Sequence, residues 1–174
     1  MGSRPNRNTT LAYIAGFLDG DGSLMLQVKK RSDTSRRWRL MATICFYQDS
    51  RHDKPLYWIQ QELGIGYISN RNDGMTELRI NGFEQVKVIL KDLQSYIKFK
   101  ENQVKTILVA IDLIESKKIS DFKQSDYEKL IQLLLKVQDN NYQSHHKKTK
   151  EDLSDIFGLT PYRLRSKDRD IVSS

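Results

Sequence analysis

The sequence predicts an α+β fold in which helices cover one face of an antiparallel β-sheet. Some segments repeat apolar residues at helical spacing, whereas two pairs of segments alternate apolar and polar residues, as β-hairpins do. These segments follow one another in the order α-β-β-α-β-β-α, with further helices toward the C-terminus. The chain has 174 residues, which is enough for one domain with a real core.

The first helix is predicted to be capped at Asn8 or Thr9 and to run to about Asp19, before Gly20-Asp21-Gly22. One of its faces is bulky and apolar, and a single contact with the core requires only that face. A second face carries small residues, which allow two helices to approach closely. We therefore expect another helix to pack against the second face, which consists of Ala12, Ala15, Gly16 and Asp19.

A cationic hairpin is predicted next, with strands from Ser23 to Arg31 and from Arg37 to Tyr47. Each strand alternates, so one face is apolar and the other is polar. From Lys29 to Arg39 the chain has six basic residues and one acidic residue, within a net charge of +7. An ordinary solvated sheet face would mix both signs, so this face predicts a polyanionic partner.

The rest of the chain continues with the same two patterns. A glycine pair ends the next helix, and a tight Asn72-Asp73-Gly74 turn joins the second pair of strands. A capping box from Ser125 to Glu128 is predicted to start one of the last helices. The predicted elements are a helix from about residue 55 to 63, strands at 67–71 and 76–80, a helix after Gly82, two longer helices, and a short helix at 151–157.

Composition limits the classes of protein to which the chain can belong. No run approaches eighteen consecutive apolar residues, so no membrane-spanning helix is expected. A single cysteine, Cys45, excludes an internal disulfide and a cysteine-built metal site, and favours an intracellular location. The neighbouring His145 and His146 do not share a helix face, so we reject a zinc site there. We expect a disordered lead at 1–7, one domain at 8–140, and a basic loop, short helix and tail at 141–174.

One motif carries a resemblance to a known family. Residues 11–22 read LAYIAGFLDGDG, and Ile14 to Gly22 resembles the signature of LAGLIDADG homing endonucleases. The motif occurs once, so the chain is similar to single-motif members, which act as homodimers, and the likeness covers roughly residues 8–140. The resemblance implies the αββαββα homing-endonuclease core with a β-sheet saddle. It also implies cleavage of both strands of a long pseudo-palindromic double-stranded DNA site by a protein encoded in an intron or intein.

Asp21 is the expected metal ligand. It lies just beyond a helix C-terminus, where the helix dipole disfavours an anion. If two such helices pack together, two copies of Asp21 repel one another unless a cation lies between them, and Mg²⁺ accepts oxygen ligands. The resemblance adds the backbone carbonyl of Gly20 as a ligand and gives Asp19 a structural role in capping the helix pair. We expect Mn²⁺ to substitute for Mg²⁺, and Ca²⁺ to support binding without cleavage.

Three further positions match polar sites of the family. By resemblance, Gln48 orders the catalytic water and Lys100 lies near the scissile phosphate, with Lys98 as the competing lysine. Another basic site of the family falls on His52 in this chain, where the family has arginine. Arg51 or Lys54 is the alternative for that peripheral role.

The outward faces of both hairpins are the expected DNA surface, because a two-stranded ribbon fits the major groove. Arginine suits guanine and glutamine suits adenine, but which residue meets which base stays open. The predicted contacts in the two hairpins are Gln27, Lys29, Arg31, Arg37, Arg39, Met41, Thr43, Tyr67, Ser69, Arg71, Glu77 and Arg79. Lys147, Lys148 and Lys150 are predicted to contact phosphates, which position a complex without specifying its sequence.

Two alternatives to cleavage remain open. An RNA-binding intron maturase or a non-catalytic DNA-binding regulator could use the same fold, and either would tolerate loss of Asp21. The presence of Asp21, Gln48 and Lys100 together favours the nuclease. The resemblance also indicates a prokaryotic cytoplasm or an organelle (chloroplast or mitochondrion) as the location.

Overall fold

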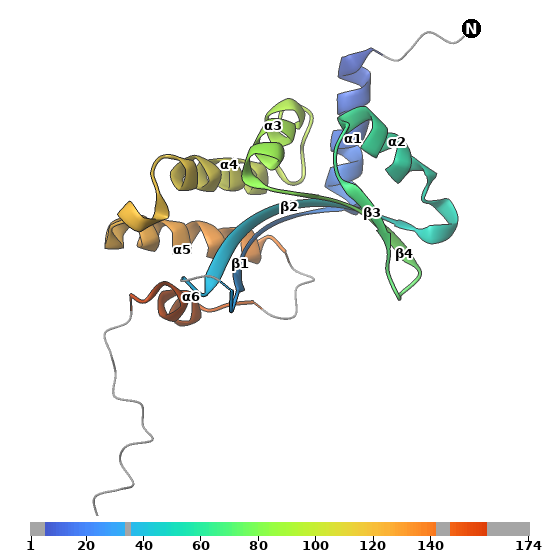
Figure 1. Ribbon diagram of the computed structural model, residues 1–174. Helices are drawn as coiled ribbons and strands as arrows, with labels where there is room; N and C mark the ends of the chain where they lie inside the picture. Colours follow the sequence, from blue (N-terminus) through green and yellow to red (C-terminus); the bar gives the residue numbers. More distant parts are fainter. Residues whose placement is uncertain (1–5, 34–35, 142–146, 160–174) are drawn as a thin grey trace, which may run out of the picture.

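The computed structural model describes residues 6–33, 36–141 and 147–159, and it confirms the predicted order of elements (Figure 1). Four strands and the helices around them form an α+β fold. The elements are α1 (Arg7–Asp21), β1 (Gly22–Lys30), β2 (Trp38–Asp49), the short 3-10 helix η1 (Ser50–His52), α2 (Lys54–Leu63), β3 (Tyr67–Asn70), β4 (Met75–Asn81), α3 (Phe83–Leu93), α4 (Glu101–Glu115), the 3-10 helix η2 (Ile119–Asp121), α5 (Gln124–Asp139) and α6 (Lys150–Phe157).

All strand pairs are antiparallel, in the order β1-β2-β4-β3. The sheet is strongly curved, and helices α1 to α5 lie on its convex side (Figure 1). Successive side chains of a strand point to opposite faces, so every second residue belongs to the concave face. The cross-strand register places Met25, Gln27, Thr43, Cys45, Tyr47, Glu77 and Arg79 on that face.

The core lies between the convex side of the sheet and the helices. Leu24, Leu26, Ile44, Leu78 and Ile80, which alternate with the concave residues, are buried in one continuous apolar cluster. Buried residues of α1, α3, α4 and α5, among them Ile14, Leu90 and Ile107, join the same cluster. Burying apolar surface is the main favourable contribution to folding, so this cluster fixes the curvature of the sheet and the position of α1.

Several helix ends differ from the prediction. The side chain of Asn6 accepts a hydrogen bond from the N–H of Asn8, so α1 begins at Arg7. Before α5, the carboxylate of Asp126 accepts from the N–H of Lys123, and the predicted box from Ser125 to Glu128 is wrong. In contrast, α2 ends as expected, because Gly64 takes the left-handed conformation (φ 66°) that glycine adopts without strain.

The domain limits also need correction at both ends. Within the predicted lead, Asn6 caps α1 and Arg7 is its first residue, whereas residues 1–5 lie outside the described residues. At the other end, Leu153 of α6 is buried in the common core, and Phe157 stacks edge-on against Trp38 with ring centroids 4.8 Å apart. Helix α6 is therefore part of the same domain. The predicted histidine pair and basic tail lie outside the described residues.

Among the described helices, none is both long enough and apolar enough to cross a membrane.

Candidate functional site

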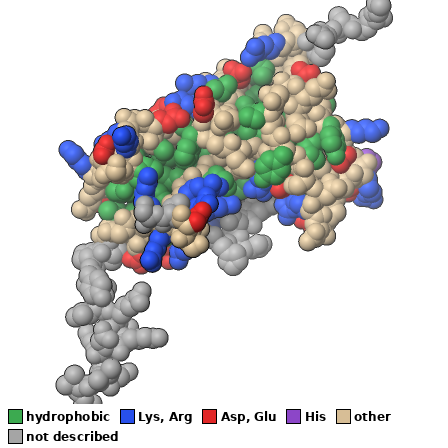
Figure 2. All heavy atoms as spheres, viewed as in Figure 1, with side chains coloured by type: hydrophobic (Ala, Val, Ile, Leu, Met, Phe, Trp, Pro, Cys, Tyr) green, Lys and Arg blue, Asp and Glu red, His purple; other side chains and the backbone are tan. Residues whose placement is uncertain are grey.

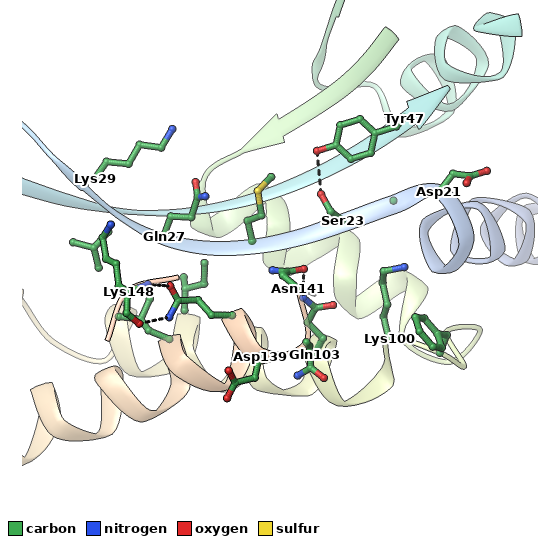
Figure 3. A pocket seen from close by; sticks show the side chains of 18 of the residues that line it. Asp21, Ser23, Gln27, Lys29, Tyr47, Lys100, Gln103, Asp139, Asn141 and Lys148 are labelled. Carbon is green, nitrogen blue, oxygen red and sulfur yellow. Dashed lines mark hydrogen bonds between the residues drawn. The ribbon is translucent and has the colours of Figure 1, made fainter. Parts of the chain in front are cut away.

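A groove of about 1240 Å³ runs along the edge strand β1, between this strand and residues of α4 and α5. One end begins where α1 meets β1, at Gly20 and Asp21, and the other end reaches Lys148 beside α6. Figure 3 shows the order of side chains along the strand, with Asp21, Ser23, Gln27 and Lys29 above residues of α4 and α5. The predicted catalytic residues Asp21, Gln48 and Lys100 all line this groove.

Asp21 occupies the junction between helix and strand. Helix α1 extends through Asp21, two residues further than predicted, and β1 starts at once with Gly22. A Cβ at Gly22 would lie 2.6 Å from Cδ1 and 2.7 Å from the carbonyl oxygen of Leu18, so only glycine permits this close approach. Asp21 is exposed and, within the described part of the chain, makes no hydrogen bond or ion pair. Its carboxylate is therefore open to a ligand.

Asp19 connects α1 to the start of α4. Its carboxylate accepts hydrogen bonds from the backbone N–H groups of Lys98 (2.6 Å), Phe99 (3.1 Å) and Lys100 (3.0 Å). These donors belong to the segment that leads into α4, whose first N–H groups need acceptors. Asp19 was predicted to lie on a helix-helix face, and within the protomer its side chain binds the backbone at the start of α4. Its structural role is to cap.

Lys100 lies between the two aspartates. Its ammonium group donates a short hydrogen bond to the backbone carbonyl of Asp19 and lies 5.2 Å from the ring centroid of Phe99. Burial lowers the pKa of Lys100 below its ordinary value, and the negative charges of Asp19 and Asp21 oppose this shift. The competing residue, Lys98, is exposed and does not line the groove. The structure thus favours Lys100.

Gln48 and Tyr47 end the second strand on the side of the groove opposite α4. The side-chain oxygen of Gln48 accepts a hydrogen bond from the N–H of Asp49 at 2.9 Å, which leaves its amide N–H₂ group free to donate. The hydroxyl of Tyr47 hydrogen-bonds that of Ser23 at 3.1 Å (Figure 3). Burial raises the pKa of Tyr47 to about 12, so this hydroxyl stays neutral at physiological pH.

Most of the predicted DNA-contacting residues have accessible side chains, either in the groove or beyond it. Gln27, Lys29, Arg71 and Lys148 line the groove, and Arg31, Arg37, Arg39, Lys147 and Lys150 lie beyond it with accessible side chains. Basic side chains gather near the ends of β1 and β2 and beside α6 (Figure 2). Tyr67 is half exposed at 50%, and Ser69 is partly buried and hydrogen-bonded to Glu77.

Three of the predicted contacts, Met41, Thr43 and Glu77, are buried and were wrongly expected to be open. Side chains on a concave face converge, so the longer ones cover the shorter ones of the central strands. Thr43 donates to Asn81 at 2.7 Å, and Arg39 reaches the sulfur of Met41. Glu77 accepts two hydrogen bonds from Arg79. These buried residues support the neighbouring side chains of the concave face, namely Asn81, Arg39 and Arg79.

The three candidates for the peripheral basic site, Arg51, His52 and Lys54, differ in position and in the contacts that they make. Arg51 forms a bidentate pair with Asp49 (2.9 and 2.7 Å), which lowers the pKa of that carboxyl well below its usual range. His52 is exposed in η1. Lys54 lies away from the groove, where it lines a shallow apolar pocket beside Tyr13 and Trp58. Lys54 is therefore not part of the groove, and Arg51 and His52 lie in η1, three and four residues after the groove residue Gln48.

The small face of α1 is only partly available. Ala12 and Gly16 are exposed, and nothing lies within 4 Å of a Cβ built on Gly16. Ala15 is fully buried in the protomer core, so its predicted contact with a second helix is wrong. Helical periodicity could not decide this, because α1 packs on both the sheet and α3.

Several groove residues were not identified from the sequence. Ser23, Met25 and Tyr47 line the groove, and their alternation with the buried Leu24 and Leu26 was a usable signal. Gln103 and Asn141 were not detectable in this way. Both donate to the carbonyl of Leu24, at 3.0 and 2.9 Å, and so join β1 to α4 and to the end of α5.

Comparisons with known proteins agree with this architecture. The chain is 31% identical over 107 residues to the DNA endonuclease I-CvuI of Chlorella vulgaris, which spans 62% of this chain and 66% of that protein. It is 29% identical over 113 residues to the DNA endonuclease I-CreI of Chlamydomonas reinhardtii, covering 65% of this chain and 69% of that protein. The match to the Chlorella protein therefore spans slightly less than two thirds of its length.

Solved structures show the same fold. The homing endonuclease I-CvuI in complex with its target superposes with a TM-score of 0.71 at 24% identity, covering 87% of this chain and 94% of the other. An archaeal intron-encoded homing endonuclease, I-Vdi141I, complexed with DNA, gives a TM-score of 0.73 at 17% identity, covering 88% and 97%. The LAGLIDADG endonuclease family matches residues 14–111, more than half of the chain. This chain belongs to the LAGLIDADG endonuclease family.

Proposed function

We propose that two copies of this chain form a site-specific endonuclease that makes a double-strand break in a pseudo-palindromic DNA target by metal-dependent phosphodiester hydrolysis. The observation that carries the proposal is the position of Asp21. It ends α1, its carboxylate makes no hydrogen bond to any described residue, and it lies in the groove that Gln48 and Lys100 also line. A curved sheet extends from this point, and basic side chains gather near the ends of β1 and β2 and beside α6. The names of the relatives, which are DNA endonucleases, support the same activity.

Dimerisation is part of the proposal, because one protomer holds only half of the expected site. The outer face of α1 exposes Ala12 and Gly16, which permit close helix packing. Beside it, Tyr13 is 51% exposed and forms an apolar pocket with Trp58. A second copy on a two-fold axis would cover both features and bring the two Asp21 carboxylates together. The DNA target would then have two equivalent half-sites.

The donor set fits a hard divalent cation. In the described residues, no group of three or more His, Cys, Asp or Glu side chains could hold a metal by itself. Asp21 and the carbonyl of Gly20 supply oxygen, and Mg²⁺ commonly takes one or two carboxylates and completes its shell with water and phosphate oxygens. A bound Mg²⁺ would supply a metal-activated water and charge stabilisation at the phosphate. I-CvuI has been solved with DNA in the presence of Ca or Mg, which supports divalent-metal use.

The chain's own residues position the reacting groups. Lys100, held by the carbonyl of Asp19, places a positive charge beside Asp21, where the scissile phosphate would lie. Gln48 keeps a free amide donor at the opposite side of the groove, where it can orient a water molecule. Arg51 and His52 follow Gln48 by three and four residues and would add positive charge there, and Arg51 keeps Nη1 for a phosphate while Nε and Nη2 bind Asp49.

DNA would lie along the concave face. Gln27, Lys29 and Arg71 are placed to reach base edges, whereas Lys147, Lys148 and Lys150 flank the face and would contact phosphates. Because phosphate contacts release counterions, affinity should fall steeply as salt rises. We further propose that the protein is intron-encoded and acts inside the cell or an organelle, on the DNA that its gene invades.

The test is digestion of a plasmid library of DNA targets by the wild type and Asp21→Asn. We expect cutting of both strands with Mg²⁺ or Mn²⁺, binding without cutting with Ca²⁺, and loss of cutting in the variant with binding retained. Equal cutting by Asp21→Asn would refute the role of Asp21. Binding without cutting under every condition would instead indicate a DNA-binding regulator, and selective binding of RNA would indicate a maturase.

A further inference from the structure

Glu77 and Arg79 form a bidentate ion pair on the concave face. Nε of Arg79 donates to Oε1 of Glu77 at 3.0 Å, and Nη2 donates to Oε2 at 3.1 Å. The hydroxyl of Ser69 also donates to Oε1, at 3.2 Å. The side chains of Glu77 and Arg79 are 10% and 22% exposed. The guanidinium is thus held in one orientation.

Two other arginines of the hairpins are held less tightly. Arg31 and Arg71 pair with aspartates whose side chains are 56% and 51% exposed, and Nη1 of Arg71 also lies 4.0 Å from Oε2 of Glu77, too far for a hydrogen bond. Exposed ion pairs contribute little and exchange readily with solvent. A buried carboxylate with a second hydrogen bond restricts the guanidinium much more strongly, because the geometry is fixed and water is largely excluded.

This contact leaves one edge of the guanidinium unused. Arginine has five N–H donors in a planar fork, and Glu77 engages Nε–H and one N–H of Nη2. In the described part of the chain, Nη1 has no hydrogen-bonded acceptor, so the edge formed by Nη1 and Nη2 remains available. Two parallel donors on that edge match the O6 and N7 acceptors of guanine in the major groove.

We propose that Arg79 reads one guanine in each half-site of the target, and that Glu77 is the positioning residue that orients it. The inference rests on the proposed DNA-binding function. Glu77 also neutralises the charge of Arg79, so the pair adds little to the general attraction for phosphate. Its contribution is therefore to sequence discrimination rather than to overall affinity.

The experiment is selection of bound DNA from a randomised library, followed by sequencing, with Ca²⁺ present. The wild type should select guanine at two positions related by the two-fold axis. Arg79→Lys keeps the charge but loses the planar fork, and should reduce the preference at those positions by about 5- to 100-fold. Glu77→Gln should weaken the same preference while binding unrelated DNA more tightly, because it removes one negative charge.

Controls separate this inference from the proposed function. Arg7→Lys makes the same chemical change in an exposed pair with Asp92, away from the groove, and should leave the selected sequence unchanged. The double variant Glu77→Gln with Arg79→Gln leaves no unpaired buried charge, so it should fold and lose the guanine preference. Retention of that preference in Arg79→Lys, or its absence in a wild type that still selects a sequence, would overturn the inference alone. A wild type that selects no sequence would overturn both.

Discussion

Replacing Asp19 with alanine tests whether this residue organises the active-site end of α4. The change removes the acceptor of three backbone N–H groups, those of Lys98, Phe99 and Lys100. A hydrogen bond to a charged group contributes about 1.5–3 kcal/mol, and loss of a helix cap costs about 0.5–2 kcal/mol. The three bonds share one carboxylate and water can replace part of them, so we expect a total loss of about 2–3 kcal/mol. In a chain of this size, that corresponds to a fall in melting temperature of roughly 4–12 °C.

The assay is urea and thermal denaturation at one fixed protein concentration, because dimerisation would make stability depend on concentration. Asp19→Asn keeps one acceptor and should lie between the wild type and Asp19→Ala. Asp92→Ala is the matched control, since it removes an exposed pair with Arg7 and should cost less than about 0.5 kcal/mol. Equal stability of Asp19→Ala and Asp92→Ala would refute the capping role.

Three further changes test other contacts. Gly22→Ala should destabilise the protein by about 1–3 kcal/mol in chemical denaturation, because the new Cβ would lie 2.7 Å from the carbonyl oxygen of Leu18. Thr76→Val should cost about 1–3 kcal/mol, since the buried Thr76 hydroxyl hydrogen-bonds Ser50, Asp53 and Asn70, whereas Thr76→Ser should remain close to the wild type in the same measurement. The pKa of Tyr47 is raised from 10.0 to about 12, so its stabilising contribution is full below pH 10 and is lost as the pH rises through 12. Between pH 10 and 12 the free energy of unfolding of Tyr47→Phe should therefore fall less than that of the wild type. Parallel plots of unfolding free energy against pH would contradict this assignment.

Local patterns were sufficient for the order and type of the elements. The alternation of Leu24, Leu26 and Ile44 with polar residues identified the strands because one face of the sheet is buried against helices. Glycine at position 64 ended α2 as expected, since the left-handed conformation at a helix end favours glycine. These features depend on residues that are near one another in sequence, so the sequence displays them directly.

Burial on the concave face was harder to predict. Alternation indicates which face a side chain occupies, but it does not indicate how far the sheet curves. Thr43 and Glu77 are on the expected face, yet they lie beneath longer neighbours and are buried. For the same reason, the helical wheel could not show that Ala15 packs inward. Curvature and packing depend on contacts between distant parts of the chain.

The hydrogen bonds of Asp19 show that contacts between distant segments were also hard to predict in the candidate site. Its acceptor role involves the N–H groups at 98–100, about 80 residues away, and nothing in the local sequence relates the two segments. By resemblance the motif gave Asp19 a structural role and Asp21 a metal-binding role, but it did not identify the groups that Asp19 contacts. The tertiary structure shows that the carboxylate of Asp19 accepts three hydrogen bonds and that the carboxylate of Asp21 accepts none from the described residues.

Asp19, Glu77 and Asp21 illustrate how hydrogen bonding separates structural from functional carboxylates. A carboxylate near a helix C-terminus or in the interior is unfavourable unless donors surround it. Asp19 receives three backbone N–H groups and Glu77 receives a guanidinium and a hydroxyl, so both are stabilised within the protomer. Asp21, in the described part of the chain, receives none, and it lies at the negative end of the α1 dipole. An unengaged acid in that position lowers the stability of the free protein, and a cation bound by two such acids would relieve this cost. The same reasoning predicts that Asp21→Asn stabilises the metal-free protein while it abolishes cleavage, which denaturation without metal and plasmid digestion with Mg²⁺ would measure. A less stable Asp21→Asn would show that the carboxylate is already satisfied within the protomer.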